Sequence, residues 1–201
     1  MTESSEEPTE RNKLVAQTLL KESDRGCVIM GAALLADALE DLLRSFFRQS
    51  PEAVGSIIDP LFGGYAPLAT FSARIQLAFA IGILPEDLRS KIEIVRRLRN
   101  EFAHAWGPID FEDAQCADRL VLLIGAEADG SSWPRARAGQ VLTQPSSDTH
   151  QPNDRMVRRL ALALSISEMI GYLGLLSSRA REGIDIRLLV RAREQRQPVK
   201  G

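Results

Sequence analysis

Apolar residues recur at helical spacing along most of the chain. In residues 22–47 they stand three, four and seven positions apart, from Val28 through Leu35 to Phe46, and therefore share one face of a long helix. The same pattern predicts four further helices, over 70–81, 85–104, 110–124 and 153–180. No segment shows the sustained alternation expected of a strand. The sequence predicts an all-α protein, a single bundle of about five to six helices.

The bundle is expected to span residues 21–186, with a charged tail at each end. Residues 1–20 begin with four glutamates and no basic residue in the first ten, which predicts an acidic, partly disordered tail. Residues 187–201 form a basic tail. Glycine, proline and serine recur through 125–152 without an apolar period, so this stretch is expected to be a long flexible insertion.

The overall composition excludes several classes of protein. The 201 residues hold 25 Lys and Arg against 27 Asp and Glu, a net charge of −2, which argues against a uniformly basic nucleic-acid binder. No uncharged apolar run is long enough to cross a membrane, and the acidic start differs from a signal peptide. Cys27 and Cys116 have no further ligand at metal-binding spacing. We therefore expect a cytoplasmic protein with no membrane contact, metal or cofactor.

One arginine falls on the apolar face of the helix over 85–104. With about 100° per residue, Arg99 lies within about 20° of Leu88, in the middle of the apolar stripe. A buried guanidinium keeps its proton and needs an acidic or carbonyl partner. Asp24 lies on the apolar face of the first long helix, so the sequence predicts a buried ion pair between Asp24 and Arg99.

Four segments resemble one known family in the same order along the chain. They are 22–26 with the Ala-Ala-Leu-Leu run that follows, 67–75, 77–82 and 97–104, and together they are similar to the mannitol-operon repressor (MtlR) family. The resemblance covers roughly residues 20–124 and the last helix. It implies a helical bundle that represses transcription of a sugar-alcohol uptake operon. We expect it to act through a protein partner or a second copy of itself, with a homodimer as one form.

Residues 99–104 also resemble the Arg-polar-His motif of HEPN domains, many of which are metal-independent ribonucleases. That resemblance implies a ribonuclease or toxin as the alternative function. His104 would transfer protons, Arg99 would hold the scissile phosphate and Asn100 would orient it. The other interpretation is structural: Arg99 forms an ion pair, and His104 packs at the end of its helix.

Direct DNA binding is a third hypothesis. Arg187, Arg191, Arg193 and Arg196 lie in the basic tail, which is either a solvated helix end or an arm that contacts nucleic-acid phosphates. Residues 77–97 have the order of small residues, a glycine turn and a second helix that is typical of a helix-turn-helix, but their acidic residues would meet the DNA backbone. Nucleic acid is therefore a candidate partner without a clear DNA-reading motif.

Overall fold

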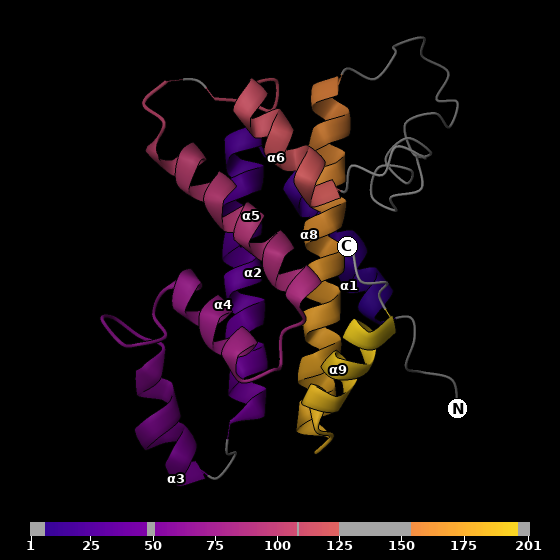
Figure 1. Cartoon of the computed structure of the whole chain (residues 1–201). Coiled ribbons are helices and arrows are strands. Elements are labelled where there is room, and N and C mark those ends of the chain that lie inside the picture. The colour runs from indigo at the N-terminus through magenta and orange to yellow at the C-terminus, as the bar shows by residue number, and fades with distance from the viewer. Residues whose placement is uncertain (1–6, 48–50, 108, 125–153, 197–201) are drawn as a thin grey trace.

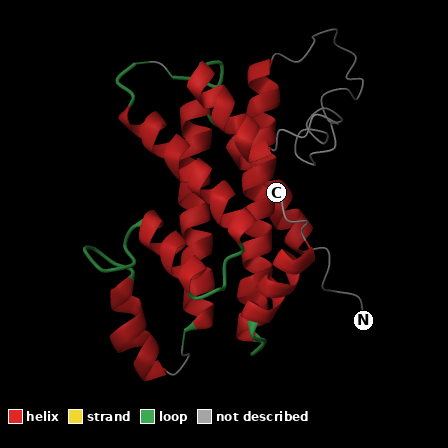
Figure 2. Cartoon of the chain, viewed as in Figure 1, coloured by secondary structure: helices red, strands yellow, loops and turns green. Residues whose placement is uncertain are grey.

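The computed structural model describes residues 7–47, 51–107, 109–124 and 154–196 (Figure 1). All regular structure within these ranges is helical (Figure 2), which confirms the all-α prediction. The predicted insertion over 125–152 lies outside the described residues.

Two long helices form the centre of the bundle. They are α2 (Asp24–Phe46) and α8 (Asp154–Arg181), which pack side by side (Figure 1). By length and composition α8 could cross a membrane, but 67% of its apolar stretch is buried inside the protein. Its apolar surface is therefore accounted for by the core of the bundle.

The other helices pack around this pair. Helix α1 (Glu7–Leu20) lies on α8, and α5 (Glu86–His104) crosses α2. Helix α4 (Phe71–Ala80) contacts both α2 and α5, and α6 (Ala114–Ile124) contacts α5 and α8. Three short elements follow α2, and one helix follows α8: α3 (Pro51–Ala53), η1 (Val54–Ile58), η2 (Asp59–Leu61) and α9 (Ile186–Arg196).

Side-chain caps fix where two of these helices begin. The Ser23 hydroxyl accepts a hydrogen bond from the Gly26 amide at 3.0 Å at the start of α2. The Thr70 hydroxyl accepts one from the Ala73 amide at 3.2 Å at the start of α4. Each cap satisfies an amide that has no partner inside the helix.

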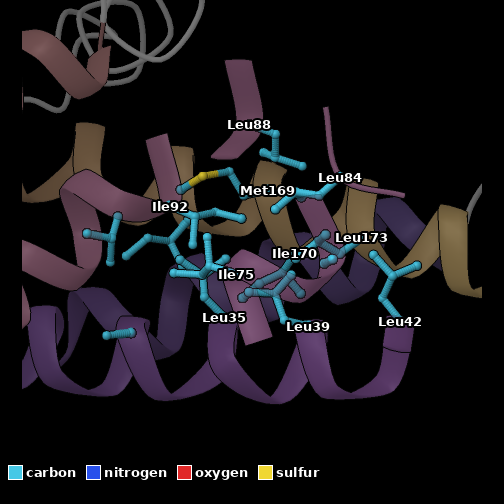
Figure 3. Close-up of a cluster of buried hydrophobic side chains, with 14 of the residues drawn as sticks. Leu35, Leu39, Leu42, Ile75, Leu84, Leu88, Ile92, Met169, Ile170 and Leu173 are labelled. Atoms are coloured by element: carbon cyan, nitrogen blue, oxygen red, sulfur yellow. The ribbon is translucent and has the colours of Figure 1, made fainter. Parts of the chain in front are cut away.

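The core lies where α2, α4, α5 and α8 meet. Figure 3 shows leucines of α2 interleaved with apolar side chains of the other three helices. The residues labelled there are all buried: Leu35, Leu39, Leu42, Ile75, Leu84, Leu88, Ile92, Met169, Ile170 and Leu173. Buried residues of α1, α6 and α9 extend the same cluster, so the described helices share one main core.

The N-terminal residues differ from the predicted disordered tail. Residues 7–20 form α1, in which Ala16 and Leu19 are buried. The Ser167 hydroxyl donates to the Asn12 carbonyl at 2.5 Å, and a Cβ at Gly171 would collide with the Asn12 amide group. The docking of α1 thus depends on the absence of a side chain at Gly171 of α8, more than 150 positions away along the chain. The acidic composition of the first ten residues conceals this face, although Val15, Ala16 and Leu19 stand at helical spacing.

A buried carboxylate joins three distant segments. Asp24, the first residue of α2, is only 2% exposed. It accepts hydrogen bonds from Arg155 Nε at 2.6 Å, from Arg159 Nε at 2.8 Å and from the Phe111 amide at 3.2 Å. Arg158 donates to the Phe111 carbonyl at 2.6 Å. The start of α2, the segment before α6 and the start of α8 are therefore held together by charge-assisted hydrogen bonds.

We predict that Gly31→Ala destabilises the protein by about 1–3 kcal/mol, because the added methyl group overpacks the core. A Cβ at Gly31 would collide with Ile166 Cδ1, and Ile166 is fully buried. Gly174→Ala is the matched control. No atom lies within 4 Å of its added Cβ, so it should leave the free energy of unfolding unchanged or raise it by up to about 1 kcal/mol. Urea denaturation measures both, and equal effects would contradict the close packing of α2 on α8.

We also predict that Asp24→Asn lowers the free energy of unfolding by about 3 kcal/mol. The substitution leaves two guanidinium groups without their buried counter-charge, and this value lies at the low end for breaking a buried pair. The low end applies because Arg155 is 40% exposed and can turn to water. Asp37→Asn, at an exposed site on the same helix, is the control and should change stability little. A similarly small effect of Asp24→Asn in urea denaturation would show that the cluster does not stabilise the fold.

Candidate functional site

Arg99 does not pair with Asp24, and that prediction is wrong. Arg99 is exposed, and its Nη1 donates to Asn100 Oδ1 at 3.1 Å. The buried face of α5 rotates along the helix: its last turns bury Leu98 and Phe102, which lie at about 280° and 320° on the same projection. A projection that assumes a straight apolar stripe along α5 therefore places Arg99 in the core. The stripe of buried residues curves around the helix, and Arg99 lies outside it.

The true partners of Asp24 come from the start of α8. Arg155, Arg158 and Arg159 share one side of this helix, because they stand three and four positions apart. That spacing indicates a basic face on an otherwise apolar helix, and the sequence alone could have shown that the three arginines lie together. It could not have paired them with Asp24, since the hydrogen bonds to Arg155 and Arg159 join residues 131 and 135 positions apart.

Arg99 and Asn100 line an open hollow of about 450 Å³ between α2, α4 and α5. Its lining combines small apolar residues of α2, the N-terminus of α4 and polar side chains of α5. These residues are Ile29, Ala32, Ala33, Ala36, Ala69, Thr70, Phe71, Ser72, Arg96, Arg99 and Asn100. The volume lies within the range of small-molecule sites.

The described residues that line the hollow include two arginines and no acidic side chain. Arg96 Nε contacts Glu93 at 2.8 Å, whereas Arg99 has only the neutral Asn100 as its hydrogen-bond partner among the described residues. The first amides of α4, at Phe71 and Ser72, have no partner inside the helix and lie at the positive end of its dipole.

His104 lies outside this hollow. It is the last residue of α5, it is exposed, and it is not among the lining residues. Directly after it, Arg25 Nη2 donates to the carbonyls of Ala105 at 2.7 Å and Gly107 at 3.3 Å. The structure therefore brings Arg99 and Asn100 together in the hollow, and His104, one turn beyond Asn100 on α5, does not line it. A catalytic role of the three residues stays a prediction.

The C-terminal basic residues belong to a helix that packs on the bundle. In α9, Arg193 Nη2 pairs with Asp87 Oδ2 of α5 at 2.8 Å. Arg187 Nε pairs with Asp185 at 2.8 Å, and the hydrogen bond from this arginine lowers the pKa of the Asp185 carboxyl. The Glu86 amide donates to Glu194 at 3.2 Å. Two of the four candidate nucleic-acid contacts are thus engaged within the protein.

The structure describes the side chain of only one of the remaining two candidates. Arg191 is exposed on α9. The side chain of Arg196 lies outside the described residues. Contact of these arginines with nucleic acid stays a prediction.

Both cysteines are free and buried. Desolvation raises the pKa of the Cys27 thiol to about 12 and that of the Cys116 thiol to about 11. Both thiols are therefore protonated at neutral pH, and the thiolate is the form that attacks substrates or binds metals. Among the described residues, no three His, Cys, Asp or Glu side chains are grouped to hold a metal ion.

Two solved structures share the fold. A chain in the X-ray structure of the MtlR–HPr complex from Escherichia coli superposes with a TM-score of 0.60 at 22% identity, over 82% of this chain and 98% of that one. A possible transcriptional regulator, YggD from Shigella flexneri, superposes with a TM-score of 0.64 at 17% identity, over 81% and 96% of the two chains.

Curated relatives and a family model are also similar to the chain. It is 26% identical over 102 residues to the mannitol operon repressors of Escherichia coli strains K12 and O6:H1. The match covers 51% of this chain and 52% of each relative, about half the length of both. Residues 12–174 match the model of the mannitol repressor family, MtlR. Since that match covers well over half of the chain and agrees with the sequence resemblance, this protein belongs to the MtlR family.

Proposed function

We propose that this protein is a cytoplasmic, repressor-type regulator of transcription, acting on a sugar-alcohol uptake operon through protein contacts. Its membership of the mannitol repressor family supports the regulatory role. A fold relative solved in complex with HPr supports a protein as the direct partner. We extend both properties to this chain, with HPr as the first partner to test.

One observation carries the preference for protein over DNA. Two of the outward basic side chains of α5, the helix that would read DNA, are paired with acids of the same helix. Arg89 pairs with Glu86 at 2.5 Å and Arg96 pairs with Glu93 at 2.8 Å. Contact with DNA phosphates depends on cations that are free to displace counterions. The two pairs therefore lower the attraction of α5 for DNA and leave Lys91, Arg97 and Arg99 as its exposed cations.

An exposed aromatic residue on a hydrogen-bonded stretch of backbone is the candidate contact for the partner. Trp106 is fully exposed. The carbonyls of its two neighbours, Ala105 and Gly107, accept hydrogen bonds from Arg25. Tryptophan is enriched among residues that dominate binding energy at protein interfaces, and a fixed backbone reduces the entropy lost on binding. We therefore assign Trp106 to the partner contact.

We predict that the organism's own HPr binds the purified protein and that Trp106→Ala weakens this binding at least tenfold, about 1.4 kcal/mol. Isothermal titration calorimetry measures the affinity. Tyr65→Ala, at a second fully exposed aromatic residue, is the matched control and should bind as the unmodified protein does. Analytical ultracentrifugation of the same samples measures self-association, which is the other protein contact that the sequence predicts.

The contrary result is sequence-specific binding to operator DNA without any binding to HPr or to a second copy. Such binding would weaken steeply with salt. It would also fall in Arg187→Gln and Arg191→Gln, and the protein would then be a direct DNA reader.

A further inference from the structure

We propose that the hollow between α2, α4 and α5 binds a small organic phosphate, held by Arg96 and Arg99. This inference goes beyond the regulatory role proposed above and does not depend on any protein partner. It rests on the space in the hollow, its charge and the donors that converge there.

The floor of the hollow is kept open by small side chains. Ala32, Ala33 and Ala36 of α2 and Ala69 before α4 all line it. Larger residues at these positions would fill the space of about 450 Å³. A volume of this size matches a ligand larger than a bare phosphate ion. The alanine methyl groups and Phe71 would contact its carbon skeleton.

Two guanidinium groups lie on one wall. Arg96 and Arg99 stand three positions apart on α5 and are therefore neighbours on its surface. Arg96 is engaged through Nε with Glu93, which does not line the hollow. Arg99 is engaged through Nη1 with the neutral Asn100. Each arginine thus keeps donors for a further acceptor, and a guanidinium fork matches the geometry of phosphate oxygens.

The opposite wall adds backbone donors. Thr70, Phe71 and Ser72 are the cap and first two residues of α4, a helix of ten residues, and all three line the hollow. The Thr70 hydroxyl is used to cap Ala73, but the amides of Phe71 and Ser72 lie at the helix end, where intrahelical partners are absent. Oxygen atoms of a phosphate are favoured ligands for such amides. The positive end of the α4 dipole therefore adds to the charge of Arg99 in the same hollow.

The surroundings favour a small molecule over a nucleic-acid strand. A strand needs a basic track that follows successive phosphates. Two other basic residues of α5 and α6 are instead paired: Arg89 with Glu86, and Arg119 with Glu101. A single hollow that combines two arginines with small apolar side chains therefore fits one phosphate ester.

The test is calorimetric titration of the full chain with inorganic phosphate, glucose 6-phosphate, glucose and a short single-stranded RNA, in low salt with chelator. We expect glucose 6-phosphate to bind more tightly than inorganic phosphate, and glucose not to bind. Arg99→Gln and Arg96→Gln should each weaken glucose 6-phosphate binding at least tenfold. Ala33→Leu should also weaken glucose 6-phosphate binding at least tenfold, because the larger side chain fills the hollow. Ala33 is exposed and lies outside the core, so this substitution should leave the fold intact.

Arg97→Gln is the matched control, since Arg97 is an exposed residue of α5 that does not line the hollow. It should leave binding unchanged, and circular dichroism checks that every variant is folded. Failure of both inorganic phosphate and glucose 6-phosphate to bind at up to about 10 mM, weaker than ordinary ligand affinities, overturns the proposal. So does equal binding by Arg99→Gln and Arg97→Gln. RNA that binds more tightly than glucose 6-phosphate, or is cleaved in a manner lost in His104→Ala, shows a nucleic-acid site instead.

Discussion

The buried carboxylate of Asp24 is the constraint on which the rest of the structure depends. An ion excluded from water must be paired and hydrogen-bonded, and its partners come from α8 and from the backbone at Phe111. These bonds fix the same end of the two central helices and the segment that enters α6. The next residue, Arg25, holds the chain that leaves α5. The start of α2 is therefore bonded to α8, to the segment before α6 and to the residues that follow α5.

The two sides of α5 have different physical roles. Its inner side is entirely apolar and packs against α2, α4 and α6. Its outer side carries two ion pairs, Arg89 with Glu86 and Arg96 with Glu93. Lys91, Arg97 and Arg99 are exposed, and the described hydrogen-bond partner of Arg99 is the neutral Asn100. The contacts proposed above lie at the hollow beside Arg99 and at the exposed Trp106 beyond the end of this helix.

The sequence predicts the central helices well and their long-range contacts poorly. Helices expected over 22–47, 70–81 and 85–104 match the observed ones to within two residues, because one buried face imposes a regular apolar period. Composition did not predict helix α1, because the acidic first ten residues conceal the helical spacing of Val15, Ala16 and Leu19 that follows them. The partners of Asp24 are a different case: its apolar setting identified a buried ion, but a pair separated by more than 130 positions leaves no local pattern. Arg99 was misplaced because the apolar stripe of α5 is curved.

The coupling between Asp24 and Arg159 tests this account most directly. A double-mutant cycle of Asp24→Asn, Arg159→Gln and the double variant, measured by urea denaturation, isolates their mutual contribution to the free energy of unfolding. Arg159 is the less exposed of the two arginines on Asp24, so it should carry most of the coupling. The account predicts a coupling of about 1–3 kcal/mol. Effects that add to within about 0.5 kcal/mol would contradict it, because the two charges would then stabilise the fold independently.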